Sequence, residues 1–147
     1  MTNRVGTSTL HEHGDNRIHV EGVLTELYYG DVHSFFEVVG GEINENSFSI
    51  PTNYGLIQSG GCNGTLQIFV YKVIDQNSKP WEYIQKKVSP EYILSPQSNV
   101  PPGDCIVIEY GTEKKKTDRI CESYEIAIQK GKLVEQKLER QGSEAQR

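Results

Sequence analysis

The run TLQIFVYKVI, from Thr65 to Ile74, constrains the fold of this chain more than any other segment. Its apolar residues recur at every second position, which places Leu66, Ile68 and Val70 on one face of an extended chain. The other face carries Gln67, Phe69 and Tyr71. Because branched and aromatic side chains pack well on a pleated surface, this run predicts a half-buried β-strand with an aromatic outer face.

Similar patterns predict further strands on both sides of this run. We expect strands at Arg17–Tyr28 and Val32–Val39, joined by a short turn. The Asn- and Gly-rich stretch 42–64 predicts an ordered loop with one or two short edge strands. Residues 104–111 and 119–131 alternate as a long hairpin would, and the lysine-rich segment between them forms its charged tip.

One segment changes from the period of a strand to that of a helix. Trp81, Ile84 and Val88 recur at the spacing of one helix face. Ser78 can cap the N-terminus of such a helix, and Pro80 is tolerated in its first turn. We therefore predict a helix of about two to three turns between Ser78 and Val88.

The predicted order of elements is strand, strand, strand, helix, strand, strand. This order is typical of a small antiparallel Greek-key barrel of the OB type, in which the helix closes one open end. We expect a mostly-β barrel of about five to seven strands over residues 17–130. A flexible arm, 1–16, precedes it, and a short helix or disordered tail, 131–147, follows. Other half-open barrels, β-grasp domains and sandwiches with a helical crossover are the alternatives.

Composition limits the classes of function. The 147 residues suffice for one domain with its own core. A net charge of −5 opposes general binding of polyanions, so contact with nucleic acid would need a local basic patch. The apolar runs are shorter than the ~20 residues of a membrane span, and the N-terminus does not resemble a secretory signal. We expect a soluble, cytoplasmic protein without membrane contact.

The three cysteines, Cys62, Cys105 and Cys121, are an odd number and include no CxxC pair. This pattern favours free thiols in a reducing compartment over a disulfide framework or a zinc ribbon. Cys105 and Cys121 lie on the two strands of the predicted hairpin, on the face opposite the isoleucines. They can form a structural pair if the register places them opposite each other.

An OB-like barrel binds its ligand on one outer face and on the adjoining loops. Aromatic side chains beside a lysine run suit single-stranded nucleic acid, because bases stack on rings and cations contact phosphates. The predicted interface consists of Phe35, Gln67, Phe69, Tyr71, Lys114, Lys115, Lys116 and Arg119. In the alternative interpretation, the lysine tip is a solvated turn and Phe69 or Tyr71 lies under the Asn-rich loop.

A second candidate site lies near the N-terminus. His11 and His13 are two residues apart, so an extended backbone directs both imidazoles to one side. Such a pair can bind zinc, nickel or copper, with His19 as a further ligand. Because no four-ligand set is complete there, the alternative is a pair of exposed histidines without a metal.

These patterns leave three functions open, and none of them predicts an organic cofactor. The first is a non-enzymatic binding module, in particular an OB-like domain for single-stranded nucleic acid. The second is a structural or assembly role, with exposed aromatic residues forming protein contacts that include homo-oligomers. The third is metal binding through His11 and His13. The sequence contains no P-loop, GxGxxG, HExxH or GxSxG motif, so we expect a binding protein more than an enzyme.

Overall fold

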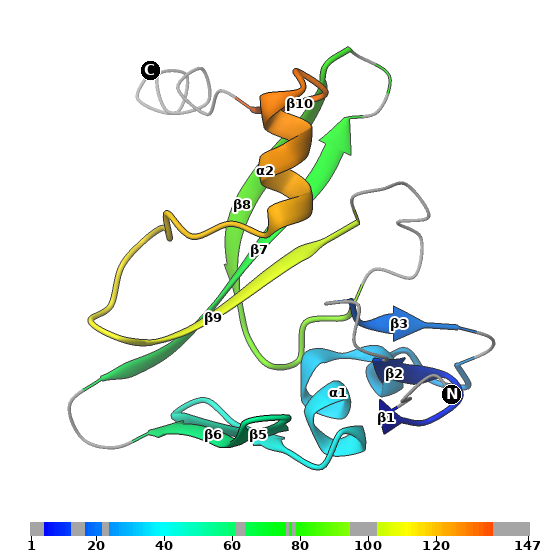
Figure 1. Cartoon of the computed structure of the whole chain (residues 1–147), viewed down its shortest axis with the longest axis vertical. Coiled ribbons are helices and arrows are strands. Elements are labelled where there is room, and N and C mark those ends of the chain that lie inside the picture. The colour runs from blue at the N-terminus through cyan, green and yellow to red at the C-terminus, as the bar shows by residue number, and fades with distance from the viewer. Residues whose placement is uncertain are drawn as a thin grey trace.

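The structure is a computed structural model that describes residues 5–12, 17–21, 24–60, 64–75, 77, 79–94 and 103–136. The described part is mostly β, with three small sheets and two α-helices (Figure 1). The elements in chain order are β1 (Val5–Gly6), β2 (Leu10–Glu12), β3 (His19–Val20), the 3-10 helix η1 (Leu27–Gly30), α1 (Val32–Val38), β4 (Glu42–Ile43), β5 (Ser47–Thr52), β6 (Gly55–Gly60), β7 (Thr65–Asp75), β8 (Trp81–Val88), β9 (Cys105–Gly111), α2 (Glu122–Gln129) and β10 (Leu133–Glu135). The mostly-β class is confirmed, whereas the described sheets do not close into the predicted barrel.

Strand β7 is central to the largest sheet, whose strand order is β10-β8-β7-β9. It pairs antiparallel with β8 on one side, where Ile68 lies opposite Val88. On the other side it pairs antiparallel with β9, where Ile68 lies opposite Ile108. The strands predicted at 65–74 and 104–111 are therefore confirmed.

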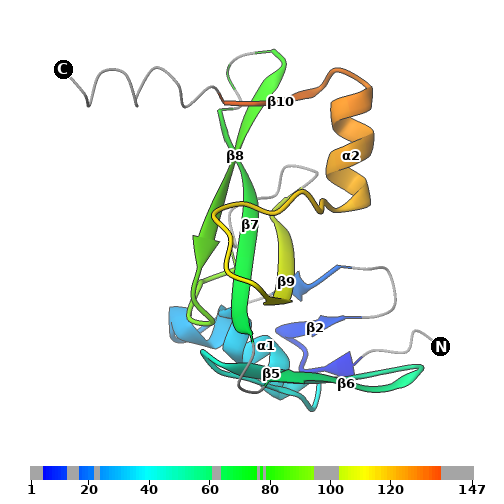
Figure 2. The ribbon, with the colours of Figure 1, turned by 90° about the vertical axis from the view of Figure 1, so that its left-hand side faces the viewer.

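Both faces of β7 are covered. One face contributes Ile68 and Val70 to an apolar cluster with α1 and the N-terminal sheets. The other face contributes Tyr71 to a second cluster with Tyr83 and Tyr124, and Figure 2 shows α2 standing beside this end of the sheet. Residues 66–71 are consequently all buried, as in a strand covered on both sides. The predicted aromatic outer face is therefore wrong.

Helix α1 occupies the segment that the alternation predicted as a strand at Val32–Val39. Asp31 caps it, because its Oδ1 accepts a hydrogen bond from the Ser34 backbone N–H at 2.7 Å. The buried residues Val32, Phe35 and Phe36 have helical spacing and face one cluster. The strand predicted at Arg17–Tyr28 is also largely wrong, since among its described residues only His19 and Val20 form a strand, β3, before η1 begins at Leu27.

Strand β8 occupies the segment predicted as a helix. Its spacing of apolar residues fits a helix, but a short apolar run does not distinguish the two forms by itself. Pairing with β7 and β10 stabilises this segment as a strand, and it places Tyr83 in the second cluster. Pro80 directly precedes the strand, where its missing N–H removes no ladder hydrogen bond.

Helix α2 replaces the second strand of the predicted hairpin at 119–131. Cys121 is its N-cap residue, and Glu122 and Glu125 lie in its first turn, where negative charge complements the helix dipole. Tyr124 is fully buried, and its hydroxyl donates to the Tyr71 carbonyl at 3.1 Å. Among the described residues, no helix combines the length and apolar character that crossing a bilayer requires.

The remaining segments also differ from prediction in part. Stretch 42–64, predicted as a loop with edge strands, forms the sheet β4-β5-β6 over its described residues. Strands β1 and β2 lie within the predicted N-terminal arm, and the side chain of Leu10 in β2 is buried. Where a short helix or tail was expected, Leu133 begins β10, which runs parallel to β8. Residues 1–4, 13–16 and 137–147 of the two predicted tails lie outside the described residues.

A disulfide joins Cys105, the first residue of β9, to Cys121 at the start of α2, with the two Cα atoms 5.8 Å apart. The predicted proximity of these cysteines is confirmed, but its cause is the packing of α2 on the sheet, not a hairpin register. The expectation of free thiols is wrong for this pair. Cys62 lies outside the described residues.

We predict that reducing the Cys105–Cys121 bond lowers the free energy of unfolding by about 3 kcal/mol, because the unfolded chain regains the entropy of an open loop. The bond spans a sequence separation of 16 residues. Urea denaturation with and without a reducing agent measures the loss. The Cys121→Ser variant is the control, since its stability should no longer depend on the reductant. Equal denaturation midpoints for the oxidised and reduced protein would contradict the prediction.

Candidate metal centre

Two short strands bring three potential metal ligands to one place. In the β2–β3 pair, His11 lies opposite His19. Glu21 follows β3, and its backbone N–H donates to the Thr9 carbonyl at 2.9 Å, which extends the pairing by one position. Residues two apart share a face of a strand, so His19 and Glu21 project on the same side as His11.

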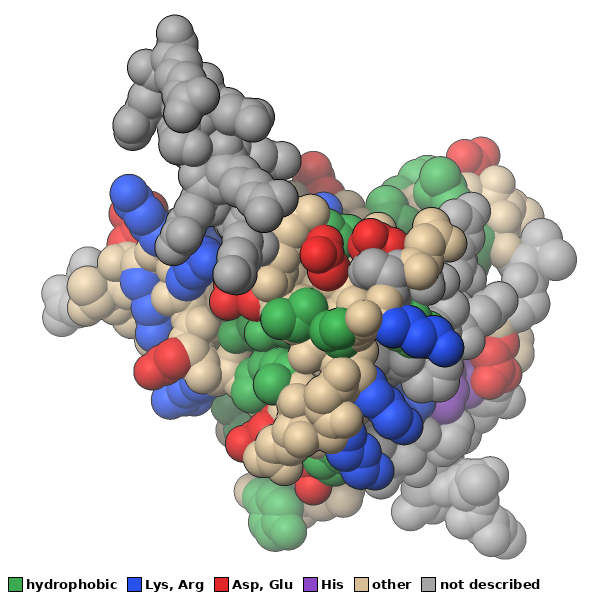
Figure 3. Space-filling model, turned by 90° about the horizontal axis from the view of Figure 1, so that it is seen from above, with side chains coloured by type: hydrophobic (Ala, Val, Ile, Leu, Met, Phe, Trp, Pro, Cys, Tyr) green, Lys and Arg blue, Asp and Glu red, His purple; other side chains and the backbone are tan. Residues whose placement is uncertain are grey.

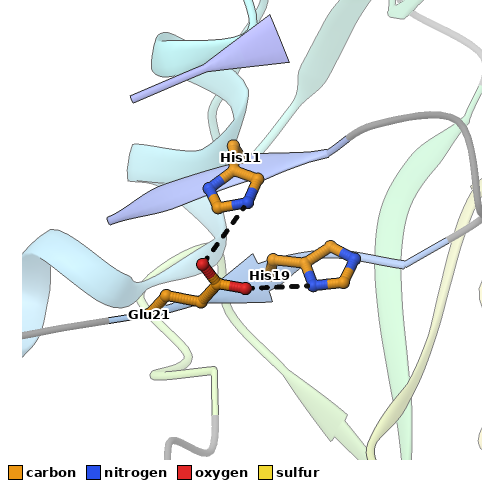
Figure 4. A group of neighbouring side chains, drawn as sticks. All are labelled: His11, His19 and Glu21. Atoms are coloured by element: carbon orange, nitrogen blue, oxygen red, sulfur yellow. Dashed lines mark ion pairs between the residues drawn. The ribbon is translucent and has the colours of Figure 1, made fainter. Parts of the chain in front are cut away.

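The three side chains converge, as Figure 4 shows. Nε2 of His11 lies 3.9 Å from Oε2 of Glu21, and Nδ1 of His19 lies 3.7 Å from Oε1 of the same carboxylate. The two imidazole rings are stacked, with their centroids 5.4 Å apart and their planes inclined by only 6°. The ligand atoms offered by the three residues all lie within 4.8 Å of one another.

The cluster extends from the protein interior to the surface. The side chain of His11 is 2% exposed, that of His19 is 22% exposed and that of Glu21 is 56% exposed. Leu10 and Val20 pack into the main apolar cluster and hold the two strands in place. A metal ion would therefore contact the buried imidazole of His11 on the interior side and the exposed carboxylate of Glu21 on the solvent side.

Gly6 packs His11 from the side of β1. The two residues are register partners in the β1–β2 pair, and Gly6 has a φ of +117°. A Cβ atom at this position would lie 2.5 Å from the Leu10 carbonyl oxygen and 3.2 Å from the His11 Cβ. Only glycine permits this conformation and this approach, so Gly6 allows β1 to cover the buried histidine.

Two imidazoles and one carboxylate form a ligand set that proteins use for catalytic zinc and for non-haem iron. Bonds of about 2.0–2.2 Å at tetrahedral angles separate neighbouring ligand atoms by roughly 3.3–3.5 Å. The separations of 3.7 and 3.9 Å between each imidazole and Glu21 are only slightly wider. Closing the set around one ion would require torsion changes in the exposed Glu21 side chain and in the partly exposed His19 ring, which is stacked on His11.

The sequence prediction identified part of this cluster. His11 and the further ligand His19 are both in it, whereas His13 lies outside the described residues, so its proposed role is untested. Glu21 was not predicted. Its signal was the His-x-Glu spacing within the predicted strand Arg17–Tyr28, which places a carboxylate on the same strand face as His19.

The aromatic residues and Gln67 of the predicted nucleic-acid interface are buried in this structure. Phe35 is buried in the main cluster as part of α1. Phe69 is fully buried, and Tyr71 is 5% exposed, with its hydroxyl donating to the Arg119 carbonyl at 2.6 Å. Gln67 is also buried, and its amide bonds the backbone of the lysine-rich segment. These residues anchor the segment 112–119 and present no rings for stacking.

The basic residues of the predicted interface are mostly paired with carboxylates. Nζ of Lys114 lies 2.8 Å from Glu109, and Nζ of Lys116 lies 3.2 Å from Glu135. Nε of Arg119 lies 3.9 Å from Glu109. Figure 3 shows the end of the molecule that carries α2, where basic and acidic side chains are interspersed. These carboxylates neutralise the positive charges that would otherwise bind the phosphates of a nucleic acid.

Glu109 organises this segment from β9. Its side chain is 9% exposed and accepts hydrogen bonds from Lys114 and from the Thr117 hydroxyl. These two hydrogen bonds, that from Lys114 foremost, hold the pKa of Glu109 below its ordinary value of 4.5. The ionised carboxylate is therefore part of what keeps the lysine-rich segment folded against the sheet.

Comparison with known proteins gives no relative. No protein-family model matches the chain, no curated protein matches it, and no solved structure has a matching fold. The geometry of the described residues is therefore the basis for assigning a function.

We predict that Glu109→Gln lowers the free energy of unfolding near neutral pH and that this loss shrinks in acid. Because the pKa of Glu109 is lower in the folded chain, its ionised form stabilises the fold above pH 4.5, and this contribution disappears as the pH falls through the folded-state pKa. Urea denaturation of both proteins across the acidic range measures the difference. A difference that stays constant down to the lowest pH at which both proteins fold would contradict the prediction.

Proposed function

We propose that this protein binds a divalent transition-metal ion through His11, His19 and Glu21. The observation that carries the proposal is the convergence of two imidazole nitrogens and a carboxylate on one face of the β2–β3 pair. The three ligands come from two strands whose register is fixed by an apolar cluster on the opposite face. Folding itself therefore assembles the ligand set, and the ion need not order a flexible segment.

The chemistry of the ligands selects the class of ion. Imidazole nitrogen suits zinc, copper, iron and nickel, whereas calcium and magnesium prefer oxygen ligands throughout. A three-residue set also leaves at least one coordination position for water or for an external ligand. The net charge of −5 favours the approach of cations to the protein. The proposed role is thus a metal-binding module with an accessible ion.

Single-stranded nucleic acid fits the described surface less well. Stacking needs exposed rings, and Phe35, Phe69 and Tyr71 are buried. Phosphate binding needs available cations, and each basic residue of the predicted interface except Lys115 lies within 4 Å of a carboxylate. The metal-binding function is therefore the one that the described geometry favours.

The proposal predicts saturable binding of Zn²⁺, with one ion per chain, to protein purified without an affinity tag and freed of metal by a chelator. Isothermal titration calorimetry measures the affinity. The variants His19→Ala and Glu21→Gln should each weaken it by at least about 10–100-fold, the loss typical of removing even an outer-shell partner. Binding should also weaken in acid, because protons compete with the metal for the ligands.

A matched control is available on α1. His33 and Glu37 form a pair with the same Nε2 to carboxylate distance of 3.9 Å, and both side chains are exposed. His33→Ala should leave the affinity unchanged, because no third ligand joins that pair among the described residues. His13→Ala should also retain most of the affinity. Absence of Zn²⁺ binding by the wild type, or equal losses in His33→Ala and His19→Ala, would refute the proposal.

A further inference from the structure

The free edge of the sheet β4-β5-β6 has the properties of a self-pairing surface. Strand β6 is the last strand in this sheet, and within the described part of the chain it pairs with β5 alone. Its residues are almost all exposed, including Leu56 at 60% and Ile57 at 52%. Figure 2 shows the β5–β6 hairpin running along the end of the molecule, with its tip away from the large sheet. We propose that two copies of this chain associate by antiparallel pairing of their β6 strands.

The register of the hairpin identifies the backbone groups that would make this contact. Thr52 and Gly55 are paired across the two-residue turn, as are Ile50 and Ile57 further along. The Ser47 carbonyl accepts from the Asn44 N–H and so faces away from β6, which makes Ser47 and Gly60 a pair without mutual hydrogen bonds. Hydrogen bonding alternates along an antiparallel ladder, so Thr52 and Gly55 form a hydrogen-bonded pair. Gly55 and Ile57 therefore direct their N–H and C=O groups toward β5. The residues between them direct these groups outward.

The outward groups of β6 belong to Leu56, Gln58 and Gly60, which are centred on Gln58. A two-fold axis beside Gln58 lets this residue exchange both backbone hydrogen bonds with Gln58 of the partner subunit. Leu56 then lies opposite Gly60 of the partner subunit, and the same contact recurs on the other side of the axis. The outward hydrogen-bonding positions of one β6 strand thus complement those of a second copy.

Charge also favours a second copy over another partner. The hairpin from Ser47 to Gly60 contains no charged residue, although the whole chain carries a net charge of −5. Two acidic molecules can therefore approach through this segment without like-charge repulsion. Exposed edge strands are commonly protected by lysine, proline or a bulge, and β6 has none of these devices. A charged partner strand would find no complementary charge here.

We expect analytical ultracentrifugation to show a monomer–dimer equilibrium between low and several hundred micromolar protein. Gln58→Pro should abolish the dimer, because proline removes the outward N–H at the centre of the contact. The matched control Gln58→Thr keeps that N–H and should still dimerise. Circular dichroism identifies any variant that does not fold. A wild type that stays monomeric, or a dimer that survives in folded Gln58→Pro, would overturn the proposal.

Cysteine cross-linking tests the register and does not depend on a proline variant. In a Cys62→Ser background, Gln58→Cys should form a disulfide-linked dimer on mild oxidation, because paired residues at the axis have Cα atoms about 5.5 Å apart. Leu56→Cys is the matched control, since its two copies would be about 14 Å apart. Non-reducing electrophoresis separates the linked dimer from the monomer. Equal cross-linking at both positions, or none at Gln58→Cys, would overturn the proposed pairing.

Discussion

The burial of β7 on both of its faces is the constraint on which the rest of the structure depends. This strand pairs with β8 and β9 and supplies side chains to two separate apolar clusters. The N-terminal sheets and α1 cover one face, and α2 with the lysine-rich segment covers the other. Each covering element is short and has little stability alone, so burial against this strand is what holds it in place. The candidate metal centre depends on that arrangement, because the β2–β3 pair that carries its ligands packs into the cluster on one face of β7.

The alternating pattern predicted some elements of the fold and misled for others. Strands β7 and β9 were predicted from alternation, which is the period of a strand, whereas the alternating run at Arg17–Tyr28 contains only β3 and the start of η1 among its described residues. Helix α1 and strand β8 were exchanged, because seven or eight residues with mixed spacing fit either form. Long-range pairing with β7 stabilises β8 as a strand. The Asp31 cap and three buried side chains stabilise α1 as a helix. The pairing of β8 is not visible within a short sequence window, whereas Asp31 before Val32, Phe35 and Phe36 is a local helix-start signal that the strand prediction did not use.

The candidate metal centre was predictable only in part for a similar reason. His11 and His19 were recognised from residue type, but their direct opposition depends on a strand register that residue type does not specify. Glu21 joins them because the β2–β3 pairing continues past the last strand residue. The prediction of an exposed aromatic face was wrong because alternation indicates which face of the strand a ring lies on. It does not indicate whether another element covers that face. Gln67 and Tyr71, on the same strand face as Phe69, are hydrogen-bonded to a segment that is more than 40 residues later in the sequence.

The disulfide and the metal-ligand cluster lie on opposite sides of β7. Cys105 pairs directly with Tyr71 of this strand, and the β2–β3 pair that carries the ligands packs into the cluster on its other face. Disulfides persist mainly in oxidising compartments, which differs from the cytoplasmic location predicted from the sequence. One strand therefore lies between the half that contains the disulfide and the half that contains the candidate metal ligands. If the proposed metal binding holds, reduction of the disulfide and loss of the ion would act on the same strand from its two sides.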